Sequence, residues 1–119
     1  MKKLAKLRIQ SAIAQQGSCF YCGLKMFEPT LPELAPTGVP PRWHKYLRCT
    51  AEHLTARQDY GRDVAPNIVA ACWWCNSRRH KGRAENAPDS LKYRQRVQSL
   101  MKKGCWHPVG TLAVDFHAI

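Results

Sequence analysis

The chain has 119 residues, with 19 lysines and arginines against 8 aspartates and glutamates, which gives a formal net charge of +11. This length allows one domain with a modest core and excludes a multidomain architecture. The excess positive charge favours a polyanionic partner, and nucleic acid is the first candidate because phosphate contacts dominate its binding. A basic surface without a specific partner is the alternative.

The N-terminal stretch MKKLAKLRIQSAIAQQG is interrupted throughout by lysine, arginine and glutamine, so it does not match a secretory signal. No window approaches the ~20 apolar residues that a membrane span needs. We therefore expect a cytoplasmic protein without a membrane partner. In that compartment thiols stay reduced, and paired cysteines indicate metal binding rather than disulfides.

The N-terminal half predicts a helix, an irregular insertion and a strand. Residues 1–16 predict a basic helix that ends at Gly17. Residues 28–41 contain five prolines and predict an extended insertion. Residues 43–55 favour a strand that runs into a hairpin. The first helix is expected to place its apolar residues near one side, namely Leu4, Leu7, Ile13 and Ala14.

The C-terminal half predicts a short strand followed by two helices. Residues 66–72 favour a short apolar strand or loop, and residues 72–82 favour a helix. Pro88, as a first helical residue, predicts a second helix over about 89–103. The tail, residues 106–119, is expected to add a strand. The second helix is expected to share one apolar face among Tyr93, Val97, Leu100 and Met101.

Four of the six cysteines form two Cys-x2-Cys pairs: Cys19, Cys22, Cys72 and Cys75. A two-residue spacer lets both thiolates of a turn face one tetrahedral ion, as a structural zinc site requires. Two such pairs in a small basic chain therefore predict structural Zn²⁺. We expect the remaining two, Cys49 and Cys105, to be small buried hydrophobic residues.

An acid, two amides and two histidines stand in the region between and after these pairs. Glu52 and His53 are adjacent, and Asn76 and His80 are four residues apart, so on a helix the latter two share a face. A hairpin that carries Glu52 and His53 and packs on that face would bring these groups together. Such a set can hold a divalent ion and keep one imidazole as a base. Each residue also has an ordinary alternative: a surface pair, a turn at Asn67, a helix cap and a solvated histidine.

The stretches CFYCG, TAEHL and NIVAACWWCNSRRH, within residues 17–83, resemble the HNH endonucleases, the ββα-metal nucleases. The resemblance implies an α+β fold in which a small ββα core is stabilised by a four-cysteine zinc site. Residues 1–16 and 84–119 would flank this core in a single domain. The implied activity is metal-dependent hydrolysis of DNA phosphodiesters, one strand per active site, leaving 5′-phosphate and 3′-hydroxyl ends.

The resemblance also implies a role for each residue that matches the family motif. His53 matches the general base, Glu52 a metal ligand, and Asn67 the amide that fixes the hairpin loop and orients the histidine. Asn76 and His80 match further ligands of the same ion. The sequence departs from the pattern in two places: Glu52 stands where aspartate is common, and QDYGRD has one glycine where two are usual.

The chemistry of these side chains is consistent with the implied reaction. Phosphodiester hydrolysis needs a base for water and a Lewis acid for the phosphorane charge. Neutral imidazole is a suitable base near pH 7 if its other nitrogen is oriented. Carboxylate, amide and imidazole ligands suit Mg²⁺ or Mn²⁺, and the histidine also admits Ni²⁺, Co²⁺ or Zn²⁺.

Three arginines that follow are expected to bind nucleic-acid phosphates: Arg78, Arg79 and Arg83. Trp73 and Trp74 are more typical of the core than of base stacking. The expected partner is double-stranded DNA, and the protein is expected to act as a monomer or homodimer. The competing interpretation is a non-enzymatic zinc-finger DNA-binding protein or an inactive HNH scaffold, for which the acid–amide–histidine set is unnecessary.

Overall fold

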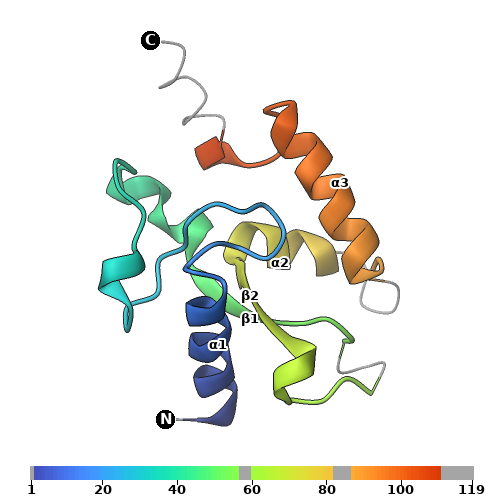
Figure 1. The fold of residues 1–119 in the computed structure, drawn as a ribbon. Helices are drawn as coiled ribbons and strands as arrows, with labels where there is room; N and C mark the ends of the chain where they lie inside the picture. The colour runs from blue at the N-terminus through green and yellow to red at the C-terminus, as the bar shows by residue number, and fades with distance from the viewer. Residues whose placement is uncertain (1, 57–59, 82–86, 111–119) are drawn as a thin grey trace.

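The computed structural model describes residues 2–56, 60–81 and 87–110 (Figure 1). They form a small mixed fold of helices and one two-stranded antiparallel sheet. Its helices and strands, in chain order, are α1 (Lys3–Ala14), β1 (Cys49–His53), β2 (Ile68–Cys72), α2 (Trp73–His80) and α3 (Ser90–Lys102). Short 3₁₀ helices lie at Pro32–Leu34, Pro41–Leu47 and Ala65–Asn67.

Helix α1 packs on both strands of the sheet (Figure 1). It ends at Ala14, and Gly17, the predicted stop, lies in the turn that follows, where it has a φ of +80° and donates its N–H to the Ala12 carbonyl at 2.8 Å. The packed side is not the expected one, because Ile13 is 55% exposed and Ala12 is buried. Polar groups carry the contact instead: Gln15 bonds both the N–H and the carbonyl of Ala70.

The two strands form an antiparallel pair whose register runs from Cys49 opposite Cys72 to His53 opposite Ile68. Strand β2 passes into α2 without an intervening loop, since Cys72 ends the strand and Trp73 begins the helix. The order β1, β2, α2 therefore brings the hairpin and the first turn of α2 together. This arrangement agrees with the expected α+β class.

The proline-rich region differs from its prediction. Pro32 and Pro41 each begin a 3₁₀ helix, because proline presets the backbone angle that the first helical residue needs. The second of these helices, Pro41–Leu47, occupies the beginning of the segment expected to be a strand, so that β1 begins only at Cys49. His44 from this helix stacks on Phe27, with ring centroids 3.8 Å apart.

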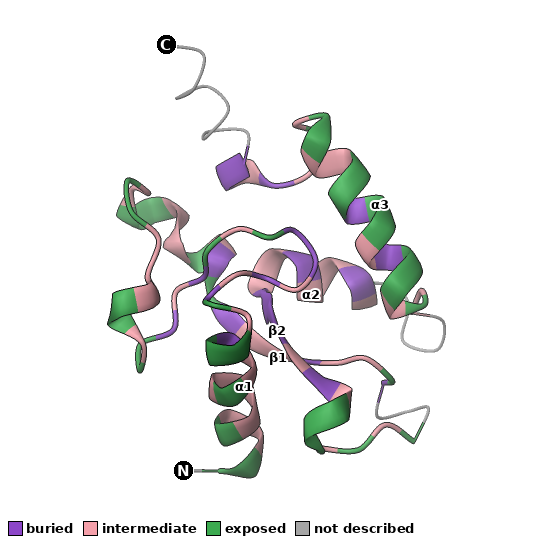
Figure 2. Ribbon diagram, viewed as in Figure 1, coloured by how far each residue is buried: buried purple, intermediate pink, exposed green. Residues whose placement is uncertain are grey.

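Helix α3, Ser90–Lys102, matches the predicted segment of about 89–103, but Pro88 is not its first helical residue. Its N-cap is Asp89, whose Oδ1 accepts the N–H groups of Leu91 and Lys92, so Pro88 precedes the cap. Tyr93 and Val97 are buried along the face expected to be apolar (Figure 2). Of the predicted tail strand, residues 108–110 are helical and residues 111–119 lie outside the described part.

The core is small and rich in sulfur and small side chains. Its buried members include Ala70, Ala71, Tyr21, Met26 and the four paired cysteines. Cys49 is buried as expected, whereas Cys105 is exposed, which corrects its prediction: it lies just after α3, where the chain turns at the surface. Within the described ranges, no helix is both long enough and apolar enough to cross a bilayer.

Candidate functional site

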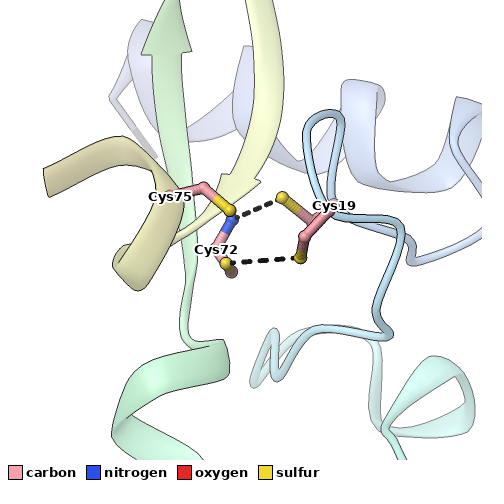
Figure 3. Close-up of side chains that lie close together, drawn as sticks. Cys19, Cys72 and Cys75 are labelled. Carbon is pink, nitrogen blue, oxygen red and sulfur yellow. Dashed lines mark hydrogen bonds between the residues drawn. The ribbon is translucent and has the colours of Figure 1, made fainter. Parts of the chain in front are cut away.

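Four cysteine sulfurs that are distant in the sequence meet at one point. They come from the loop after α1, the end of β2 and the first turn of α2: Cys19, Cys22, Cys72 and Cys75. All four side chains are buried, and their Sγ atoms lie within 4.8 Å of one another. Figure 3 shows three of these side chains pointing toward one another.

The spacing of the sulfurs fits one tetrahedral ion. The Sγ atoms of Cys22 and Cys72 are 3.9 Å apart. Tetrahedral Zn–S bonds of about 2.3 Å place two ligands about 3.8 Å apart. The two Cys-x2-Cys pairs therefore form a cluster that could hold a metal ion, as the sequence predicts.

Several N–H groups point at these sulfurs. The backbone N–H groups of Tyr21 and Cys72 donate to Cys19 Sγ at 3.4 and 3.3 Å. The indole N–H of Trp106 donates to Cys75 Sγ at 3.3 Å. Such donors stabilise thiolate over thiol, and thiolate is the form that binds a metal.

The four thiols also perturb one another. Burial raises the pKa of Cys72 and of Cys75, and hydrogen bonding with Cys19 and Cys22 adds to the rise. Burial acts against ionisation of Cys19 too, but hydrogen bonds from the other three thiols and from the Cys72 N–H lower its pKa. The protein alone thus favours ionisation of Cys19 over that of Cys72 and Cys75, and a bound cation would stabilise the latter two as thiolates.

His107 is a neighbour of the cluster that the sequence did not reveal. It is 1% exposed, and its Nε2 lies 3.6 Å from Cys72 Sγ. Its Nδ1 accepts the Val109 N–H at 3.1 Å, so Nε2 carries the proton and donates toward the sulfur. Burial lowers the pKa of His107 to about 4, which keeps the ring neutral near pH 7. No regular spacing links it to the cysteine pairs, so no sequence signal was available.

The second group of predicted residues lies between β1 and α2. Glu52 is 2% exposed, and His80 Nε2 lies 3.1 Å from its Oε1. Its Oε2 accepts a hydrogen bond from the Tyr21 hydroxyl at 3.0 Å and lies 3.2 Å from Arg79 Nη1. The structure therefore brings Glu52 and His80 together, in a network that also contains a buried tyrosine and a buried arginine.

His53 has a different partner from its neighbour Glu52, because adjacent residues of a strand point to opposite faces. Its Nε2 lies 2.7 Å from Oδ1 of Asp63, which belongs to the loop between β1 and β2. The imidazole is 14% exposed and the carboxylate 34%. Asp63 was not predicted, since a pairing across ten residues of irregular loop leaves no periodic pattern.

The two asparagines both make connections between segments. Asn67 Oδ1 accepts the Thr55 N–H at 2.8 Å, and its Nδ2 donates to the carbonyls of Thr55 and Arg62. It thus joins the two ends of the loop between the strands. Asn76 donates through Nδ2 to Thr50 Oγ1 at 3.0 Å and to the carbonyl of residue 51 at 3.3 Å. Both partners are on β1, and neither is Glu52 or His80.

The arginines differ from one another. Arg78 stacks on the Trp74 ring, with its guanidinium carbon 3.1 Å from the centroid. Arg79 is 3% exposed and donates to the carbonyls of Pro88, His53 and Leu54. A guanidinium used in this way connects β1 to the start of α3 and is not exposed to phosphate, which corrects the role expected for Arg79. Arg83 lies outside the described residues.

Comparisons with protein-family models, curated proteins and solved structures find no match to this chain. What the protein does must therefore be inferred from its own residues and their geometry.

Proposed function

We propose that the protein is a metal-dependent DNA endonuclease of the HNH type, which hydrolyses phosphodiesters and nicks one strand per active site. Strand β1 ends at His53, so Glu52 and His53 lie at the end of the hairpin where the loop to β2 begins. The order β1, β2, α2 places His80 beside that end. The scissile phosphodiester would lie across it, between the base and the acid–histidine pair.

The observation that carries the proposal is the pairing of His53 with Asp63. A carboxylate only accepts hydrogen bonds, so Nε2 carries the proton and donates to Asp63 Oδ1 over 2.7 Å. Nδ1 is then the unprotonated nitrogen, available to take a proton from water. An imidazole oriented by a carboxylate is the arrangement that general-base catalysis requires. The resemblance to HNH enzymes implies this same role for His53.

Glu52 and His80 fit the ligand pair of a divalent ion. Their facing atoms are 3.1 Å apart. Neighbouring ligands of an octahedral ion with bonds of about 2.1 Å are about 3.0 Å apart. Asn76 fixes its amide nitrogen on β1 and keeps its oxygen as an acceptor, as a third ligand needs. Mg²⁺ or Mn²⁺ bound there would stabilise the charge of the phosphorane and of the leaving oxygen.

The four-cysteine cluster is proposed to hold structural Zn²⁺. Four thiolates satisfy a tetrahedral zinc ion completely, which leaves no position for substrate. The cluster supports the reaction indirectly, because Tyr21 lies between Cys19 and Cys22 and holds Glu52 through its hydroxyl. The net charge of +11 supports double-stranded DNA as the substrate.

A competing role is specifically favoured by one observation. Glu52 already forms an ion pair with Arg79 and accepts a hydrogen bond from Tyr21, and such a network also serves a purely structural purpose. A zinc-stabilised DNA-binding protein or inactive scaffold would contain the same contacts.

Nicking of supercoiled plasmid, with and without added Mg²⁺ or Mn²⁺, separates these roles. His53→Ala should slow nicking by at least ~10²-fold, the low end of what a positioned base contributes. Asp63→Asn should slow it by at least ~10-fold, because an amide can hold the wrong tautomer. His44→Ala is the control, since that ring stacks on Phe27 and its Nε2 contacts the Val39 carbonyl, neither of which belongs to the proposed site. A wild-type protein that never nicks DNA with any divalent ion would establish the competing role, and an undiminished His53→Ala rate would remove His53 as the base.

A further inference from the structure

A groove of about 390 Å³ lies between α2 and α3, and none of the four paired cysteines, Glu52, His53 or His80 lines it. Three cationic side chains line it: Arg78 from α2, and Lys92 and Arg96 from α3. The rest of its wall is apolar and aromatic, formed by Pro88, Tyr93, Val97 and Trp106. Its volume is within the range of about 300–1,000 Å³ that small-ligand pockets occupy.

The aromatic residues of the wall direct their polar atoms inward. The Tyr93 hydroxyl donates to the Cys75 carbonyl at 2.7 Å, and the Trp106 indole N–H donates to the sulfur of the same residue. Both rings are thereby fixed, and what they offer to a ligand is ring surface. The wall is therefore preorganised for a flat apolar group.

The cations are placed for an anion beside that wall. Arg78 is held by stacking on Trp74, and a guanidinium held by its face keeps its N–H edge available. Lys92 and Arg96 are exposed and four residues apart on α3, so they stand on the same side of the helix. The described lining contains no acidic side chain.

A ligand with a negative charge beside a flat apolar ring fits this groove, and that is the chemistry of an unstacked nucleotide. We propose that the α2–α3 groove binds a nucleotide of single-stranded nucleic acid, with its phosphate on Arg78, Lys92 and Arg96 and its base against Trp106. A duplex does not qualify, because its bases are covered by their stacked neighbours. An acidic peptide supplies charge without a planar ring, so it uses only half of the site.

The groove is separate from the proposed cleavage site. Consecutive helical residues are about 100° apart, so Arg78 and His80 point to nearly opposite sides of α2. Binding in the groove goes beyond the proposed endonuclease function and does not require it. Where both exist, the protein would hold a single-stranded segment while the opposite side of α2 faces the cut.

Fluorescence anisotropy of a fluorescein-labelled single-stranded thymidine octamer tests the proposal, using the zinc-loaded 119-residue chain without added Mg²⁺ or Mn²⁺. Lys92→Ala/Arg96→Ala should weaken binding by at least ~10-fold and reduce the slope of log K against log salt by about 1.4, since each lost single-strand phosphate contact contributes ~0.7. The matched control is Lys3→Ala/Lys6→Ala, which removes two exposed cations from α1. The control should weaken binding less than ~3-fold. All four side chains are exposed, and zinc content and circular dichroism verify that both variants are folded.

An abasic octamer with the same phosphates tests the apolar wall. It should bind the wild type about tenfold more weakly than the thymidine octamer does, which is within the range for loss of base–aromatic stacking. The proposal is overturned if the two double variants lose affinity equally, or if the abasic strand binds as well as the thymidine strand. It is also overturned if an octamer of glutamate displaces the thymidine strand at equal concentration, because the groove would then be an acidic-peptide site.

Discussion

Tyr21→Phe tests whether the zinc loop holds the Glu52 carboxylate. The substitution removes one oxygen from a side chain that is 0% exposed, and it keeps the ring packed edge-on against Phe20 and Tyr93. The lost contact is a 3.0 Å hydrogen bond to a carboxylate that is 2% exposed. Burial and the nearby Glu52 charge both raise the pKa of Tyr21, so it is a neutral donor throughout the accessible pH range.

Hydrogen bonds to a charged group contribute about 1.5–3 kcal/mol, against about 0.5–1.5 kcal/mol between neutral groups. Tyr21→Phe should therefore lower the free energy of unfolding by about 2 kcal/mol. The control is Tyr93→Phe, whose hydroxyl donates to the neutral carbonyl of Cys75, and it should cost about 1 kcal/mol. Urea unfolding followed by circular dichroism, at fixed free zinc, measures both values. A cost for Tyr21→Phe no greater than that for Tyr93→Phe would refute a role of the zinc loop in holding Glu52.

Two further predictions concern the cysteine cluster and Glu28, the first residue of the proline-rich segment. Cys72→Ser should abolish the binding of about one Zn²⁺ per chain and prevent folding at 37 °C, because the binding energy of a structural site is folding energy; elemental analysis and circular dichroism check this, and exposed Cys105→Ser should retain the zinc. Burial alone would raise the pKa of Glu28, but hydrogen bonds from Arg8 and Thr30 lower it. As pH falls, Glu28 therefore takes up a proton in the unfolded chain before it does so in the folded protein. The contribution of its carboxylate to the free energy of unfolding is complete above the ordinary pKa of 4.5 and is lost as pH falls below it. The stability difference between wild type and Glu28→Gln should shrink as pH falls below about 4.5, and a constant difference from pH 6 to 3 would contradict the pairing.

The parts of the structure that the sequence predicted are those in which spacing determines geometry. A two-residue spacer lets both thiolates bind one ion in many different folds, so the cysteine cluster could be predicted before the fold was known. The turn that ends α1 was predictable from a local signal too, because Gly17 readily adopts the positive φ found there. Helical spacing also placed Arg79 near His80, and both contact Glu52. What spacing could not show is that Arg79 satisfies backbone carbonyls, because those groups come from other segments.

The contacts of His53 and His107 belong to the same unpredictable class. Each depends on how an irregular segment folds back, and carboxylate or imidazole partners at irregular separations look like ordinary surface residues in a sequence. The exposure of Ile13 has a similar cause. Hydrogen bonds between Gln15 and Ala70 help to determine which side of α1 faces β2. The positions of the apolar residues in the sequence do not reveal these bonds.

The positions of the four cysteines along the chain also determine the order in which the cluster can assemble during synthesis. Cys22 and Cys72 are separated by 50 positions, so the first pair leaves the ribosome with only half of a coordination sphere. The strands and the beginning of α2 must follow before four ligands are present. The residues that cover Cys75, Tyr93 and Trp106, emerge later still. A ribosome-bound chain that stops before Cys75 would therefore exchange metal freely, and only the chain that continues past α3 would enclose it.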